Sequence, residues 1–183
     1  MGKIVAGIAT SHVPAVGHAV DAGKQQEPYW APMFEGYEFS KQWVKDNPAD
    51  VDIIVYNDHA SYFGMEIMPT FAMGIADNYA ICDEGYGRRP IPDVEGAPEL
   101  STHIAASLIT DDFDMTILNV LEVDHGLTVP MSLMYGTPEK WPTKVIPLPV
   151  NVVMNPQPSG ERCLSLGKAR FTKADMSTAC SMG

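Results

Sequence analysis

The sequence has 183 residues, enough for one domain whose hydrophobic core needs neither a disulfide nor a zinc ion to fold. Hydrophobic residues make up 45%, which argues against disorder, and the formal net charge of −11 disfavours binding to nucleic acid or an anionic membrane. No apolar run approaches the roughly 20 residues of a membrane span, and the N-terminus is a poor signal peptide. The three widely spaced cysteines are typical of free thiols. We therefore expect a cytoplasmic protein.

The first half of the chain alternates apolar runs with Pro-rich segments. In chain order we expect a buried strand over 3–9 that stops at Thr10-Ser11-His12, a loop over 21–37, a helix over 38–46 that Pro48 ends, and a strand over 51–56 that runs into Asn57-Asp58-His59.

The second half continues the alternation. In chain order we expect a strand within 70–75, a long structured loop over 83–96 and a helix over 97–109. A strand over 115–120 then leads towards Asp124-His125-Gly126. An extended run over 144–153, whose Pro147 and Pro149 favour a sheet edge or a bulge, precedes a helix from Ser159 to about residue 170.

Strands that alternate with helices indicate an α/β fold. Three of the expected strands lead into a histidine motif, at His12, His59 and His125. Ligands of open α/β sheets bind beyond the carboxyl ends of the strands. If the three strands are neighbours and run in the same direction, the three histidines therefore line one crevice.

His12 and His59 are the leading candidates for metal ligands. Neutral imidazole binds iron, zinc and copper, and two histidines with one carboxylate form the facial site of non-haem ferrous oxygenases. The competing interpretation is two ordinary polar residues at strand ends. The pair alone does not identify the metal.

His125 has several open roles: a donor to substrate, an acid or base, a third ligand, or a turn residue bonded to the backbone. Asp58 points away from the face of His59 in an extended chain and favours a structural turn. Arg88 and Arg89 could meet a substrate carboxylate, or form a solvated loop or a structural ion pair. His18 is expected in solvent or a loop.

A series of short motifs resembles the class III (LigB-type) extradiol dioxygenases, in particular the beta chain of protocatechuate 4,5-dioxygenase and gallate dioxygenase. The resemblance covers roughly residues 3–170. The motifs that carry it, in order, are Ile8-Ala-Thr-Ser-His-Val-Pro14, Tyr56-Asn-Asp-His-Ala60, Pro69-Thr-Phe-Ala72, Asp83-Glu-Gly85, Val123-Asp-His-Gly126, Trp141-Pro142, Val145-Ile-Pro147 and Pro149-Val-Asn-Val152.

This resemblance implies a three-layer αβα sandwich with a central, mostly parallel or mixed sheet in a catalytic domain over 1–170, followed by a divergent and disordered tail over 171–183. It implies an Fe(II)- and O₂-dependent enzyme that opens the ring of protocatechuate or a similar catechol carboxylate. His12 and His59 match the iron ligands, His125 a histidine of the substrate pocket, and Asn57 a close neighbour of the iron. The implied partners are a small alpha chain and further copies of the protein.

The family's third ligand, a glutamate, and its acid–base histidine lie far downstream and have no counterpart in this sequence. We therefore expect a C-terminally truncated chain with an incomplete sheet. The alternative hypotheses are a catalytically incompetent fragment or non-enzymatic subunit that keeps the fold and the partner surface, and a zinc hydrolase that uses His12 and His59.

Overall fold

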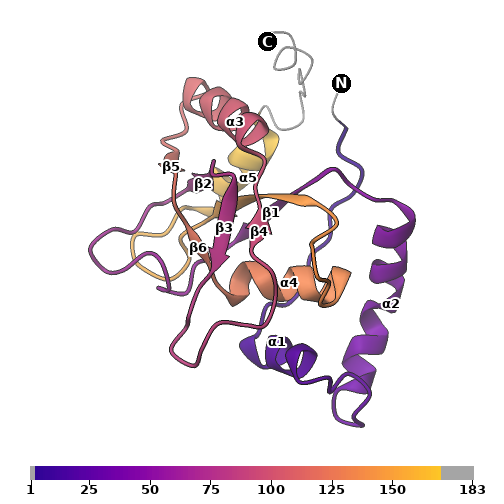
Figure 1. Cartoon of the computed structure of the whole chain (residues 1–183). Helices are drawn as coiled ribbons and strands as arrows, with labels where there is room; N and C mark the ends of the chain where they lie inside the picture. The colour runs from indigo at the N-terminus through magenta and orange to yellow at the C-terminus, as the bar shows by residue number, and fades with distance from the viewer. Residues whose placement is uncertain (1–2, 170–183) are drawn as a thin grey trace.

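Helices lie on both sides of a central layer of strands in the computed structural model, which describes residues 3–169 (Figure 1). This arrangement confirms the expected α/β class. One outer layer contains α3 (Pro98–Thr110) and α5 (Gly160–Lys168), and the other contains α1 (Pro14–Asp21), α2 (Ala31–Asp46) and α4 (His125–Tyr135).

The strands of the central layer form three small sheets. β1 (Val51–Tyr56) pairs in parallel with β7 (Lys144–Pro149), β2 (Ala72–Gly74) with β5 (Thr116–Leu118), and β3 (Asn78–Ile81) with β6 (Glu122–Val123), while β4 (Val94–Glu95) is antiparallel to β3. Isolated bridges from Phe71 to Val150 and from Gly96 to Val145 connect these sheets. The layer is therefore mixed and mostly parallel, as expected.

Two strands of this layer, β2 and β7, are buried on both faces. Successive residues of a strand point to opposite faces, and along β7 Val145 packs under α4 whereas Ile146 packs under α3 and α5. Ala72 and Met73 of β2 divide in the same way between the two clusters. Burial on both faces explains why these strands are continuous apolar runs rather than alternating ones.

α4 is the most deeply buried helix. Its Leu127 and Met131 pack on the strands, and its Val129 and Leu133 pack against α1 and α2. A Cβ atom added to Gly17 would lie 2.7 Å from a methyl group of Val129, so glycine allows α1 to approach α4 closely. α4 is thereby enclosed between the strand layer and the two outer helices.

The structure corrects three expectations for the N-terminal part. Residues 3–9 form no strand, because no strand among the described residues pairs with them, and Ile4 and Val5 are exposed. α1 begins at Pro14, where no helix was expected. α2 begins at Ala31 rather than at residue 38, because Pro32 occupies its first turn and is compatible with a helix there.

Other expectations agree with the structure. β1 has the predicted bounds, α3 differs by one residue at each end, and Ser159 caps α5 by accepting a hydrogen bond from the Arg162 backbone N–H at 3.1 Å. α4, β3, β4 and β6 were not expected. The divergent tail over 171–183 lies outside the described residues.

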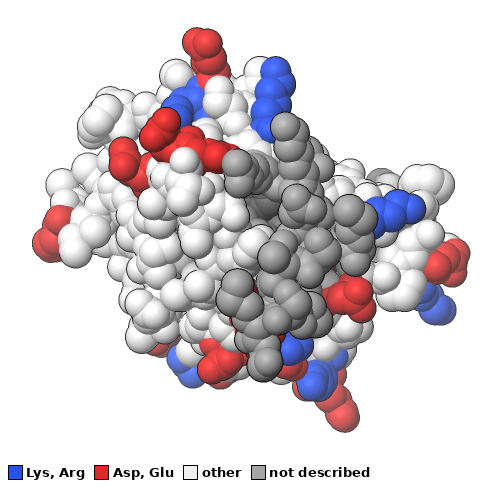
Figure 2. Space-filling model, turned by 90° about the horizontal axis from the view of Figure 1, so that it is seen from above, with Lys and Arg blue, Asp and Glu red and all other residues white. Residues whose placement is uncertain are grey.

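Charged side chains lie mainly around the rim of the face that carries α3 and α5, and much of the described surface between them is uncharged (Figure 2). None of the helices among residues 3–169 combines the length and the apolar character that crossing a membrane requires.

Candidate metal centre

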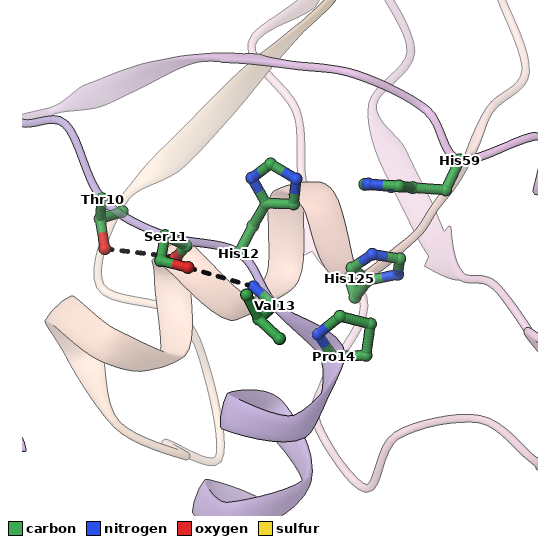
Figure 3. A pocket seen from close by; sticks show the side chains of 7 residues that line it. All are labelled: Thr10, Ser11, His12, Val13, Pro14, His59 and His125. Atoms are coloured by element: carbon green, nitrogen blue, oxygen red, sulfur yellow. Dashed lines mark hydrogen bonds between the residues drawn. The ribbon is translucent and has the colours of Figure 1, made fainter. Parts of the chain in front are cut away.

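The structure brings together the three histidines that sequence motifs singled out. The ring centroids are 5.0 Å apart for His12 and His59, 3.9 Å for His59 and His125, and 6.1 Å for His12 and His125. Figure 3 shows the rings of His59 and His125 stacked on one side, with the ring of His12 across from them. They line a cavity of about 490 Å³, together with residues 10–14. The expected crevice therefore exists, although His12 follows no strand.

His59 is held by a buried carboxylate. Asp124 Oδ2 accepts hydrogen bonds from both the backbone N–H and the ring Nδ1 of His59, each at 2.9 Å. An ionised carboxylate has only acceptors, so Nδ1 carries the proton and Nε2 keeps its lone pair. Asn57 Nδ2 lies 3.0 Å from this Nε2, which makes Asn57 a direct neighbour of the candidate ligand atom.

Asp124 also fixes the start of α4. Its Oδ1 accepts the Gly126 N–H at 2.8 Å, an N-cap contact, and its side chain is fully buried. A Cβ on Gly126 would lie 2.7 Å from the Asn57 carbonyl oxygen, so glycine is needed for α4 to reach the end of β1. One carboxylate thus connects the loop after β1, through His59, with the first turn of α4 and places His125 beside His59.

His125 is the first residue of α4 and has a carboxylate of its own. Glu84 accepts the backbone N–H of His125 through Oε1 at 3.0 Å and accepts a hydrogen bond from its ring Nδ1 through Oε2. The loop that carries Glu84 turns at Gly85 and Gly87, whose φ values of +95° and +94° favour glycine. Asp83 Oδ1 accepts the N–H of both glycines at 2.9 Å.

His12 is held less firmly than the other two. Its segment contacts α2 through Tyr37, whose hydroxyl oxygen accepts hydrogen bonds from Thr10 Oγ1 at 2.9 Å and from the Ser11 N–H at 3.4 Å. Burial, followed by the proximity of the His59 and His125 rings, lowers the pKa of His12. These effects favour the neutral imidazole, which is the form that binds metals.

The residues present fit a bound divalent metal ion. His59, Asp124 and His125 offer ligand atoms that all lie within 4.8 Å of one another. The oxygens of Asp124 already accept the hydrogen bonds of His59 and Gly126, an arrangement typical of a carboxylate that orients a metal-binding histidine. His12 stands across the same cavity and completes a set of three imidazoles.

The other residues that the sequence singled out have structural positions. Asp58 accepts the backbone N–H groups of residues 61–63 and forms the expected turn. Arg89 forms a partly buried two-bond ion pair with Asp21, at 2.7 and 2.8 Å, so the structural interpretation is confirmed for it. Arg88 is exposed, 3.9 Å from Glu122. His18 is exposed on α1, as expected.

Sequence reasoning missed the roles of Asp124 and Glu84. Both are acidic residues inside motifs that also contain a histidine or glycines, but Glu84 is 41 positions from His125 and Asp124 is 65 positions from His59. Nothing in a single sequence links residues so far apart. The available signal was chemical: a metal-binding histidine usually has a carboxylate or carbonyl partner for its second nitrogen.

Comparisons with known proteins find similar sequences among aromatic dioxygenases. Gallate dioxygenase of Pseudomonas putida is 42% identical over 89 residues, which cover 49% of this chain and 26% of that protein. A 2,3-dihydroxyphenylpropionate/2,3-dihydroxicinnamic acid 1,2-dioxygenase of Photorhabdus laumondii is 27% identical over 162 residues, or 88% of this chain and 48% of that protein. A protein of the same name from Escherichia coli is 33% identical over 119 residues.

The chain spans half or less of the length of these relatives. They are gallate and dihydroxyphenylpropionate dioxygenases, so the similarity is not specific to the protocatechuate enzyme that the motifs resemble. The family model described as the catalytic LigB subunit of aromatic ring-opening dioxygenase matches residues 6–174. With that match over nearly the whole chain, the protein belongs to the LigB family of aromatic ring-opening dioxygenases.

Proposed function

We propose that this chain takes part in Fe(II)- and O₂-dependent extradiol cleavage of a catechol carboxylate. The observation that carries the proposal is the set of three imidazoles around one cavity, two of them held through Nδ1 by carboxylates, the buried Asp124 and the partly buried Glu84. Imidazole ligands suit ferrous iron, and two histidines leave positions free for other ligands.

His12 and His59 are the proposed metal ligands from this chain. A ferrous ion held there would supply a common binding position for the catechol oxygens and for O₂, whose two atoms both enter the ring-opened product. Asp124 fixes the ring of His59, and His125 contacts the substrate from the first turn of α4. Asn57, next to Nε2 of His59, is proposed to lie beside the metal.

The proposed substrate is protocatechuate or a similar compound that carries two adjacent ring hydroxyls and a carboxyl group. Gallate and 2,3-dihydroxyphenylpropionate, for which the relatives are named, share these groups. By the family resemblance we also propose a small alpha chain, self-association and a cytoplasmic location. A carboxylate third ligand and the acid–base histidine would come from outside the described residues.

The test combines activity with metal affinity. The purified chain is loaded anaerobically with Fe(II), mixed with each of the three catechols, and exposed to O₂, and oxygen uptake and ring-opened product are measured. His12→Ala and His59→Ala are expected to abolish uptake and to weaken Fe(II) binding, whereas His18→Ala, an exposed histidine on α1, changes neither. Equal effects of all three substitutions on Fe(II) affinity would contradict the ligand assignment. Hydrolysis with Zn(II) and no oxygen uptake would favour the zinc hydrolase instead.

A further inference from the structure

We propose that Glu84 is a positioning residue that holds His125 with its ring Nε2 unprotonated, as a hydrogen-bond acceptor facing the cavity. This inference rests on the proposed function in one respect: the group that Nε2 accepts from is a hydroxyl of the bound catechol. The hydrogen-bond geometry itself does not depend on that function.

The contacts between Glu84 and His125 are paired. Both carboxylate oxygens of Glu84 are used, one by the backbone N–H of His125 and the other by its Nδ1. The two side chains are only 11% and 8% exposed, so water competes little for these bonds. A carboxylate that binds the backbone and the ring of the same residue fixes both the position and the rotation of that ring.

The position of Glu84 is itself fixed by its loop. Asp83 closes the turn by accepting the N–H groups of Gly85 and Gly87. These two glycines have positive φ values, a conformation that other residues adopt only with strain. Since the loop is closed independently of His125, Glu84 sets the position of the imidazole, and not the reverse.

The chemistry of the pair determines the tautomer. An ionised carboxylate can only accept, so His125 Nδ1 must donate and the neutral ring has its lone pair at Nε2. His125 lines the cavity that His12 and His59 also line. There an Nε2 lone pair can accept the proton or the hydrogen bond of a catechol hydroxyl, which an Nε2–H could not do.

The substitution Glu84→Gln reverses this arrangement without a change of size. If the Gln carbonyl oxygen keeps the backbone N–H of His125, its amide group faces Nδ1 and must donate to it. The proton of the His125 ring then moves to Nε2, and His125 becomes a hydrogen-bond donor towards the cavity. Glu122→Gln removes the same charge from an exposed glutamate of β6 and is the matched control.

The experiment is ¹⁵N NMR of the metal-free full chain with labelled histidine, at about pH 8.5, which is two units above the ordinary imidazole pKa of about 6.5. Wild type and Glu122→Gln are expected to show His125 with a protonated Nδ1 and an unprotonated Nε2, and Glu84→Gln the opposite pattern. A protonated Nε2 in wild type, in the neutral or the doubly protonated ring, overturns the proposal, as does a Glu84→Gln spectrum equal to that of wild type. If Glu84→Gln does not fold, the wild-type spectrum alone decides.

This readout separates the two proposals. Absence of oxygen uptake with the expected tautomer refutes the proposed function and leaves the positioning role intact. Ring cleavage by a wild-type protein with Nε2–H refutes the positioning role and leaves the function intact.

Discussion

Asp124→Asn tests the double role of the carboxylate that connects β1 with α4. The amide oxygen of Asn can still accept the Gly126 N–H, and Asn is as good an N-cap as Asp, so the start of α4 is retained. The amide nitrogen then faces the backbone N–H and Nδ1 of His59. The amide NH2 of Asn and the backbone N–H of His59 are then two donors that face each other. The His59 ring can accept a hydrogen bond from the amide at Nδ1 only if its proton moves to Nε2.

Two separate losses follow. The partly buried backbone N–H of His59 loses its acceptor, which lowers the free energy of unfolding by about 1 kcal/mol. The protonated Nε2 no longer offers a lone pair to a metal ion. Removal of such an orienting carboxylate typically lowers metal affinity about 10–100-fold, which equals about 1.4–2.7 kcal/mol of binding free energy.

The assay measures urea unfolding and anaerobic Fe(II) binding for the same samples. Ser159→Ala is the control, because it removes an N-cap from α5, far along the chain from the histidines, and costs about 1 kcal/mol of stability without touching the site. The reasoning is refuted if Asp124→Asn binds Fe(II) as tightly as wild type, or if Ser159→Ala weakens binding as much as Asp124→Asn does.

Three further predictions use other parts of the structure. Tyr37→Phe removes the hydroxyl that accepts a hydrogen bond from Thr10 in the segment of His12. We expect a loss of about 0.5–1.5 kcal/mol in unfolding free energy and weaker Fe(II) binding. An unchanged Fe(II) affinity in a metal titration would contradict this role. Arg89→Met leaves Asp21 without its partner where the two side chains are only 8% and 14% exposed, so we expect the free energy of unfolding to fall by about 3 kcal/mol. A fall of less than about 1 kcal/mol in urea unfolding would refute the importance of the pair. Burial raises the pKa of Asp52 above its ordinary value of 3.8, so the folded state keeps this proton to higher pH than the unfolded chain does. Stability therefore falls as the pH rises from 3.8 through the raised pKa. Asp52→Asn should flatten that decline, and equal slopes of unfolding free energy against pH for wild type and Asp52→Asn would contradict the prediction.

The sequence was most informative where local pattern and tertiary environment agree. The apolar run over 51–56 is bounded by polar residues and forms β1 with those bounds, which placed His59 correctly at a strand end. The run over 3–9 has a similar composition but forms no strand, because a strand also needs a partner and composition does not supply one. His12 nevertheless reaches the cavity, since α1 begins two residues later and directs the chain there.

α4 escaped prediction for a physical reason. A helix is usually recognised by one apolar stripe, but α4 is buried on opposite sides, so its apolar residues show no such stripe. Pro130 within the helix and Gly126 in its first turn further disguise it. The one local signal was Asp124 as an N-cap, and its second task, holding His59, depends on a contact between residues far apart in the chain.

The unpaired segment that carries His12 has a consequence for how the site assembles. Among the described residues, no backbone–backbone hydrogen bond holds residues 3–12, whereas His59 follows a paired strand and His125 begins a buried helix. Amide hydrogens of this segment should therefore exchange with solvent rapidly in the metal-free protein, and those of α4 slowly. A metal ion bound there would meet His59 already fixed and would order His12, so part of its binding free energy would go into restraining residues 3–12.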